Sequence, residues 1–140
     1  MSEQYFGVDP PLARLLLLAS RWFDAVSREQ LARLGWPRLS AGQTLFFAHL
    51  LPDGVSVAEL ARRLGNSRQA THQMVRGLVD LGFLRVEDDP SRRGGRLVFL
   101  APRGHDLFSD SVKVLGDIEN TLEPRHVQAL RGALQSLRLE

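Results

Sequence analysis

The sequence predicts a mainly α-helical protein with one small β-hairpin. Apolar residues recur at intervals of three and four along most of the 140 residues, which is the period of a helix packed on one side. Between residues 84 and 100 the period changes to two, and the two alternating stretches flank a segment rich in Gly and charged residues. Pro, Gly and capping residues divide the helical part into six segments.

The composition limits the class of protein. A chain of 140 residues that is 44% hydrophobic can form one compact domain or one subunit of a small oligomer. There is no cysteine, which excludes disulfides, thiolate metal ligands and cysteine nucleophiles. The wholly apolar run at residues 15–19 is far too short to span a bilayer, and no signal peptide is visible. We therefore expect a cytoplasmic protein without membrane association.

The first helix is expected over residues 12–26, with Asp9 as its cap ahead of two prolines. Its apolar positions spread over more than one face, so the helix is expected to pack against two partners. Residues 30–39 are expected to form a loop around Gly35-Trp36-Pro37.

Three helices follow, each with its own capping signal. Ser40 opens the first with a capping box, and Ser56 opens the second in the same way. Gly65 ends the short second helix, Asn66 or Ser67 caps the third, and Gly82 ends it. A short helix, a glycine turn and a second helix form a helix-turn-helix, because the glycine permits the steep crossing of the pair.

The third of these helices has two different faces. Its inward face is predicted to hold Ala70, Thr71, Met74, Val75 and Leu78. Arg and Gln on the other face suit the major groove of double-stranded DNA, because Arg pairs bidentately with guanine and Gln with adenine. The predicted DNA-binding residues of this helix are Ser67, Arg68, Gln69, His72, Gln73 and Arg76.

The predicted hairpin forms a basic wing behind the helix-turn-helix. Arg92 and Arg93 lie beside glycines at its tip, and Arg96 follows on the returning strand. Arginine inserted into a narrow minor groove is a known mode of DNA recognition. In the alternative interpretation, the tip arginines pair with Asp88 and Asp89 in a mobile charged loop.

Charge is distributed unevenly along the chain. Residues 56–103 carry nine arginines against five acidic residues, whereas residues 104–140 carry four basic against six acidic residues. A basic surplus confined to the middle of the sequence is expected where one face meets a polyanion.

The ordered motifs over residues 40–104 resemble the MarR family, the multiple antibiotic resistance regulators. The family's patterns are a helix start of the type Leu-Thr/Ser-x-x-Gln, a short Leu-Ala helix, and a recognition helix ending in Leu-x-x-x-Gly-Leu-x-x-Arg. A wing of the type Asp-Pro-x-Asp-Arg-Arg and a closing Leu-Thr-x-x-Gly follow. The corresponding segments here are residues 39–43, 59–61, 78–85, 89–94 and 100–104.

The resemblance implies a winged helix-turn-helix regulator of transcription that works as a homodimer. It assigns residues 1–39 to an N-terminal dimerisation helix and connection, 40–103 to DNA binding, and 104–140 to C-terminal dimerisation helices. The apolar surplus of residues 12–26, 107–122 and 127–137 agrees with such a dimer. A two-fold dimer would bind a pseudo-palindromic site.

The resemblance also implies repression that a small, often aromatic, ligand relieves. The candidate lining of a ligand cleft is Trp22, Phe46, His49 and Phe108. Aromatic residues at helical spacing are also ordinary core residues, so this assignment competes with a purely structural one.

Two positions depart from the family pattern. Arg92 stands where the wing usually has a second aspartate, which puts the family's acid–arginine brace in doubt. Ala70 and His72 stand where the recognition helix usually has paired threonines, so contacts made by those hydroxyls do not carry over.

Other functions are less well supported by the residues. A winged-helix module that binds protein without binding DNA would lack the arginine-rich wing and would present an apolar recognition helix. An enzyme would require a phosphate loop, a nucleophile elbow or a metal-ligand motif, and the sequence contains none. The four histidines form no close cluster, so we expect neither a metal nor a cofactor.

Overall fold

Six helices and three short strands make up the part of the chain described by the computed structural model, residues 9–139. The first eight residues and residue 140, which the sequence assigned to the two dimerisation regions, lie outside it. In chain order the elements are α1 (Leu12–Arg33), α2 (Ala41–Ala48), β1 (Val55–Ser56), α3 (Val57–Leu64), α4 (Arg68–Asp80), β2 (Leu84–Asp88), β3 (Arg96–Leu100), α5 (Pro102–Glu119) and α6 (Pro124–Gln135).

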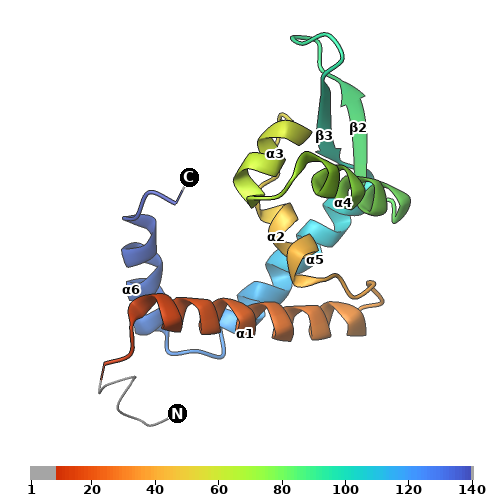
Figure 1. Cartoon of the computed structure of the whole chain (residues 1–140). Helices are drawn as coiled ribbons and strands as arrows, with labels where there is room; N and C mark the ends of the chain where they lie inside the picture. Colours follow the sequence, from red (N-terminus) through yellow and green to blue (C-terminus); the bar gives the residue numbers. More distant parts are fainter. Residues whose placement is uncertain (1–8, 140) are drawn as a thin grey trace, which may run out of the picture.

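The elements form a head and a helical base (Figure 1). The head contains α2, α3, α4 and the sheet, and its β2–β3 hairpin projects away from α1. The base contains α1, α6 and α5, which leaves the head and runs down to pack against α1. The base therefore connects to the head through α5 and through the chain between α1 and α2.

The three strands form an antiparallel sheet in the order β1-β3-β2. Val98 in the middle of β3 pairs with Val55 of β1 on one side and with Val86 of β2 on the other. The core of the head packs beneath this sheet, and its fully buried members include Phe46, Leu60, Leu78, Phe83 and Val98. The sheet thus anchors the hairpin to the helices.

The base is much less well packed than the head. Helix α6 contributes no buried residue. Large apolar side chains remain exposed on all three base helices and the segments that follow α5 and α6, namely Leu12, Leu15, Leu17, Leu18, Trp22, Phe108, Val112, Leu115, Leu122, Leu130, Leu137 and Leu139.

The structure corrects two local predictions and adds a strand. Helix α1 continues beyond residue 26 to Arg33, and a turn at Leu34 and Gly35 follows it, so the loop predicted over residues 30–39 begins only at residue 34. Its N-cap is Pro11, and no side chain makes a capping hydrogen bond there, so Asp9 is not the cap. Strand β1 was not predicted at all, because two residues are too few to show a period.

Gly104 is expected to tolerate no side chain. A Cβ atom there would lie 2.1 Å from the carbonyl oxygen of Phe83, where α5 begins against the turn between α4 and β2. Gly104→Ala should therefore lower the free energy of unfolding by about 3 kcal/mol, as overpacking in a rigid site does. Urea unfolding measures this loss. Gly77→Ala is the control, because a Cβ at that helical position meets open space; equal stability of the two variants would contradict the prediction.

Candidate nucleic-acid interface

The helix-turn-helix consists of α3, a tight turn and α4. Gly65 ends α3 in the left-handed conformation, with φ at 67°, a conformation that glycine adopts without strain. Ser56 accepts a hydrogen bond from the Glu59 amide at 3.1 Å, and Ser67 accepts one from the Ala70 amide at 3.1 Å. Both helices therefore begin at capping serines that the sequence indicated. The capping box predicted at Ser56 is wrong in its second half, because the Glu59 carboxylate binds Arg62 and Arg63 instead of the Ser56 backbone amide.

The two faces of α4 are as different in the structure as in the sequence. Thr71, Val75 and Leu78 are buried, and Met74 is half-buried. Ala70, predicted to face inward, is exposed, because the buried stripe begins one residue later. All six predicted contact residues are exposed, namely Ser67, Arg68, Gln69, His72, Gln73 and Arg76.

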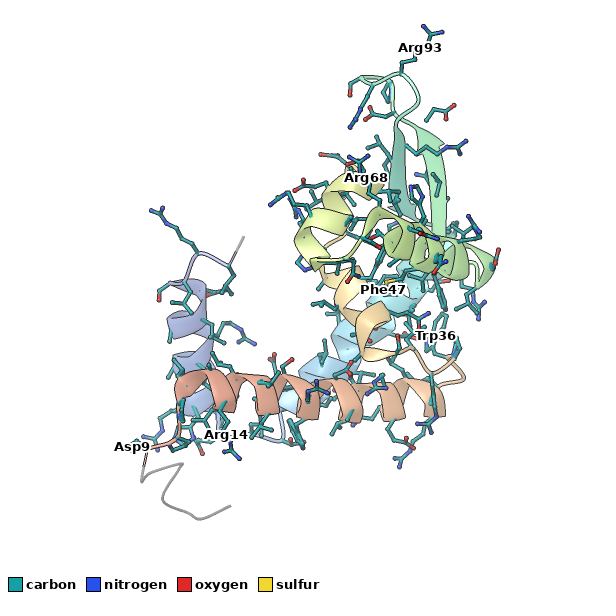
Figure 2. The ribbon with its side chains drawn as sticks, viewed as in Figure 1. Asp9, Arg14, Trp36, Phe47, Arg68 and Arg93 are labelled. Carbon is teal, nitrogen blue, oxygen red and sulfur yellow. The ribbon has the colours of Figure 1, made fainter. Side chains whose placement is uncertain are left out.

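The hairpin carries its arginines on the outside. Arg92, Arg93 and Arg96 are all exposed. Figure 2 shows Arg93 at the far end of the hairpin and Arg68 lower down, by the helices of the head. Among the residues described, neither Asp88 nor Asp89 forms an ion pair with these arginines.

A serine organises the wing tip instead. The Oδ1 atom of Asp89 accepts hydrogen bonds from the Ser91 amide at 2.9 Å and from the Ser91 hydroxyl at 2.7 Å. These bonds, with a smaller contribution from the charge of Arg92, lower the pKa of Asp89. The Asp89–Ser91 contact thus shapes the turn where the family pattern predicts an acid–arginine brace. Within residues 9–139 the Arg92 guanidinium forms no ion pair.

A cavity of about 200 Å³ lies between the start of α4 and the β2–β3 hairpin. Arg68 and His72 line it from α4, and the first residues of α3 form another part of its wall. The wing arginines Arg92, Arg93 and Arg96 line it as well, together with Asp89. The structure thus brings two of the six predicted helix residues together with all three predicted wing residues. Ser67, Gln69, Gln73 and Arg76 do not line this cavity.

Helix α3 adds an ion-pair cluster that the sequence analysis missed. The Glu59 carboxylate accepts hydrogen bonds from Arg62 Nε at 2.9 Å, from Arg62 Nη2 at 2.5 Å and from Arg63 Nε at 2.9 Å. These bonds from Arg62 and Arg63 lower the pKa of Glu59 to about 2. The spacing of three and four residues was the available signal, since side chains so spaced are neighbours on a helix.

The low pKa of Glu59 predicts a pH-dependent contribution to stability. The group titrates near 4.5 when unperturbed and near 2 in the folded protein. Its contribution is therefore fully present above pH 4.5 and is lost as the pH falls towards 2. Glu59→Gln should have a lower Tm than wild type at pH 7, and the difference should vanish near pH 2.

Thermal unfolding scans between pH 7 and pH 2 measure this difference. Glu123→Gln is the matched control, because the Glu123–Arg125 pair is longer, at 3.7 Å, and highly exposed at the arginine. A Glu59→Gln difference that stays constant over the whole pH range would contradict the assignment.

A second, larger cavity of about 800 Å³ lies between α1, α2 and α5. Of the four candidate ligand residues, only Phe108 lines it. Phe46 is fully buried in the core of the head, Trp22 is 45% exposed, and His49 caps the end of α2. The Phe47 ring, another aromatic residue that the sequence offers for such a cleft, contributes to the apolar wall. The polar lining includes Arg21, Asp24 and Arg28, which the sequence did not indicate.

Neither a metal site nor a membrane segment is found in the region described. Residues 9–139 contain no group of three His, Cys, Asp or Glu side chains placed to hold a metal ion. Within the same residues no helix is long and apolar enough to cross a bilayer.

The sequence and the fold are similar to those of known proteins. Residues 38–94 match the model of the MarR family. Wild-type MarR from E. coli in its apo form shares 21% sequence identity, with a TM-score of 0.69 over 91% of this chain and 96% of that one. RV1404 from Mycobacterium tuberculosis shares 24% identity, with a TM-score of 0.66 over 89% of this chain and 90% of that one.

A third structure is a mutant MarR from E. coli complexed with operator DNA. It shares 22% identity, with a TM-score of 0.65 over 90% of this chain and 92% of that one. A search of curated proteins gives no match. The segment of residues 38–94 therefore matches the MarR family, and the chain has the fold of MarR over most of its length.

Proposed function

We propose that this protein is a transcriptional regulator that binds double-stranded DNA in a sequence-specific manner. The observation that carries the proposal is the exposed polar face of α4 beside a cavity lined by Arg68, His72 and three wing arginines. Similarity to a MarR structure complexed with operator DNA supports it. A DNA partner also agrees with the cytoplasmic location expected from the sequence.

The two elements would make different contacts. Arg68 and Gln73 lie on the exposed face of α4 and have the side chains that pair bidentately with guanine and adenine in the major groove. Ser67 and the first amides of α4 would hold a phosphate. The wing arginines would lie along the backbone or in the minor groove, where a narrow groove concentrates negative potential.

The protein-interaction alternative fits this surface less well. A winged helix that binds another protein through α4 would present an apolar outward face there. In α4 the large exposed apolar side chain is Val79, at 37% exposure in the last turn, away from the polar residues at the start of the helix. The charge and polarity of the face favour a polyanion.

The active form is proposed to be a homodimer joined through α1, α5 and α6. An isolated helix of 12 residues is marginal in water, and α6 has no buried residue within its own chain. A partner subunit would cover the exposed Leu130 of α6 and the exposed Leu137 that follows this helix. It would also cover the exposed leucines of α1. Each such leucine would contribute about 1.5–3 kcal/mol if it became fully buried.

The regulator is proposed to be a repressor that a small ligand releases from DNA. The cavity between α1, α2 and α5 has the size of a small-molecule site, which is about 300–1,000 Å³ in proteins generally. One buried oxygen of Asp24 has no hydrogen-bond partner among the described residues, although its other oxygen lies 3.0 Å from Arg28 Nε. Asp24 and Arg28 would orient a ligand that combines an apolar body with a polar group.

A bulky residue in this cavity should abolish the response to ligand. Ser20 lies on α1 at the cavity wall, far in sequence from the DNA-binding elements, so Ser20→Phe should fill the space and leave DNA affinity unchanged. Gel shifts with 2-hydroxybenzoate at millimolar concentration provide the probe. Wild type should release the duplex, and Ser20→Phe should keep it. Equal release from both proteins would contradict the assignment of the cavity.

A gel shift on DNA from upstream of the protein's own gene tests DNA binding itself. A specific complex should form with this duplex and not with a shuffled duplex of the same composition. Its affinity should fall steeply with salt, because each phosphate contact releases counterions. Equal binding to both duplexes, or none to either, would overturn the proposal.

A further inference from the structure

One arginine at the start of α5 contacts both the recognition helix and the chain that leads from the base. Arg103 Nη1 donates a hydrogen bond at 2.6 Å to the carbonyl oxygen of Leu81, the C-cap residue of α4. The guanidinium carbon lies 4.9 Å from the centre of the Phe83 ring and 5.7 Å from that of Trp36. A single side chain therefore joins α5, the end of α4 and the α1–α2 connection.

Trp36 is held from a second point on α5. Its indole Nε1 donates a hydrogen bond at 2.8 Å to Asp110 Oδ2. Asp110 follows Arg103 by two helical turns, so both residues lie on the same face of α5. The Trp36 ring also packs against Phe83, with ring centres 6.0 Å apart. In Figure 2, Trp36 lies where the chain passes from α1 to the head.

This cluster connects α5 to the end of α4 and to the chain between α1 and α2. Helix α5 runs from the head to α1, so its first turn is rigidly connected to the base. Leu81 and Phe83 directly follow α4, so contacts with them fix the end of α4. A guanidinium is planar and offers several donors in fixed directions, so it can stack on rings and cap a carbonyl at the same time. A lysine ammonium at this position would provide a point charge without the stacked plane.

We propose that the clamp formed by Arg103, Trp36 and Asp110 is a positioning device that sets the distance between the two recognition helices of the dimer. The inference rests on the proposed DNA-binding function. In a two-fold dimer, a small change in the angle between α4 and α5 displaces both recognition helices relative to each other. The preferred separation of DNA half-sites depends on that displacement, because each helix must enter a major groove on the same side of the duplex.

The test measures affinity as a function of half-site separation. Duplexes are first enriched from a random library with the wild-type protein, and the two half-sites are then moved apart or together by one and two base pairs. We expect wild type to prefer one separation by about tenfold or more, and Arg103→Met to discriminate by less than about threefold. Arg125→Met on α6 is the control and should keep the wild-type profile.

Three results would overturn the proposal. Arg103→Met with an unchanged profile would show that the clamp does not set the separation. Weaker binding by the same factor at every separation would assign Arg103 a general stabilising role only. If Arg103→Met does not unfold cooperatively, Trp36→Phe replaces it, since this change keeps a ring and removes the hydrogen bond to Asp110. A wild-type profile for Trp36→Phe would overturn the proposal equally.

A spectroscopic measurement separates this inference from the function on which it rests. The chain has two tryptophans, so Trp22→Phe leaves Trp36 as the sole tryptophan, which excitation at long wavelength selects over the one tyrosine. Adding Arg103→Met should move the Trp36 emission to longer wavelength, because water replaces the guanidinium over the ring. If the wild-type protein binds no duplex, the proposed DNA-binding function is wrong. Unchanged Trp36 emission would refute the clamp, whether or not the protein binds DNA.

Discussion

Leu15→Glu combined with Leu18→Glu is expected to convert the dimer to a monomer and to weaken DNA binding by about 100- to 10,000-fold. Both leucines lie on α1 and are 47% and 48% exposed in the single chain. In the proposed dimer each glutamate would bring an unpaired charge into an apolar contact, which proteins rarely tolerate. The loss of affinity follows because two linked half-sites bind with a high effective concentration that a monomer lacks.

Light scattering and gel shifts measure the two effects on the same samples. Leu51→Glu is the matched control, since Leu51 is 42% exposed but lies between α2 and β1, outside the base helices. This variant should remain a dimer and bind DNA as wild type does. A double mutant that stays dimeric, or a monomer that binds DNA with full affinity, would contradict the proposed assembly.

Arg68→Ala and Gln73→Ala are each expected to weaken binding to the enriched duplex by about 1–3 kcal/mol, as the loss of a base contact does. Binding to a shuffled duplex should change far less, so the preference for one sequence relaxes. Arg93→Ala should instead weaken binding to both duplexes by a similar factor and reduce the salt dependence, because a phosphate contact carries no sequence information.

Fluorescence anisotropy titrations with the two duplexes distinguish these effects. Arg125→Ala on α6 controls for the loss of a positive charge away from the proposed interface. The placement of the DNA-binding face would be wrong if the α4 and wing variants all bound both duplexes with wild-type affinity.

Local signals in the sequence predicted the helix-turn-helix well. Ser56, Gly65 and Ser67 determine helix ends through their own side chains or backbone freedom, so their effect does not depend on the rest of the fold. The buried stripe of α4 likewise follows from its helical period. The exception is Ala70, a small residue whose burial is decided by its neighbours.

The parts that the sequence did not predict depend on distant segments. The larger cavity has walls from α1, α2 and α5, and periodicity within one helix cannot locate a space among three. The contact between Trp36 and Asp110 joins residues 74 positions apart. Strand β1 exists because Val55 and Ser56 pair with Val98 and Leu97 of β3, which lie far along the chain.

The wing tip is an intermediate case. The replacement of an expected aspartate by Arg92 predicted that the usual brace would be missing. The hydrogen bonds from Ser91 to Asp89 follow a local pattern common in turns, so the sequence contained the signal for the substitute contact. The structure adds that this contact leaves the wing arginines beside Arg68 and His72.

Hydroxyl-radical footprinting on the enriched duplex tests the central claim most directly, because it reports where both copies of the helix and wing lie on DNA. A dimer with two recognition helices should protect two patches on one face of the duplex, about 10–10.5 base pairs apart from centre to centre, flanked by weaker protection from the wings. A single protected patch, or uniform protection without sequence preference, would contradict the account of a two-fold, sequence-reading regulator.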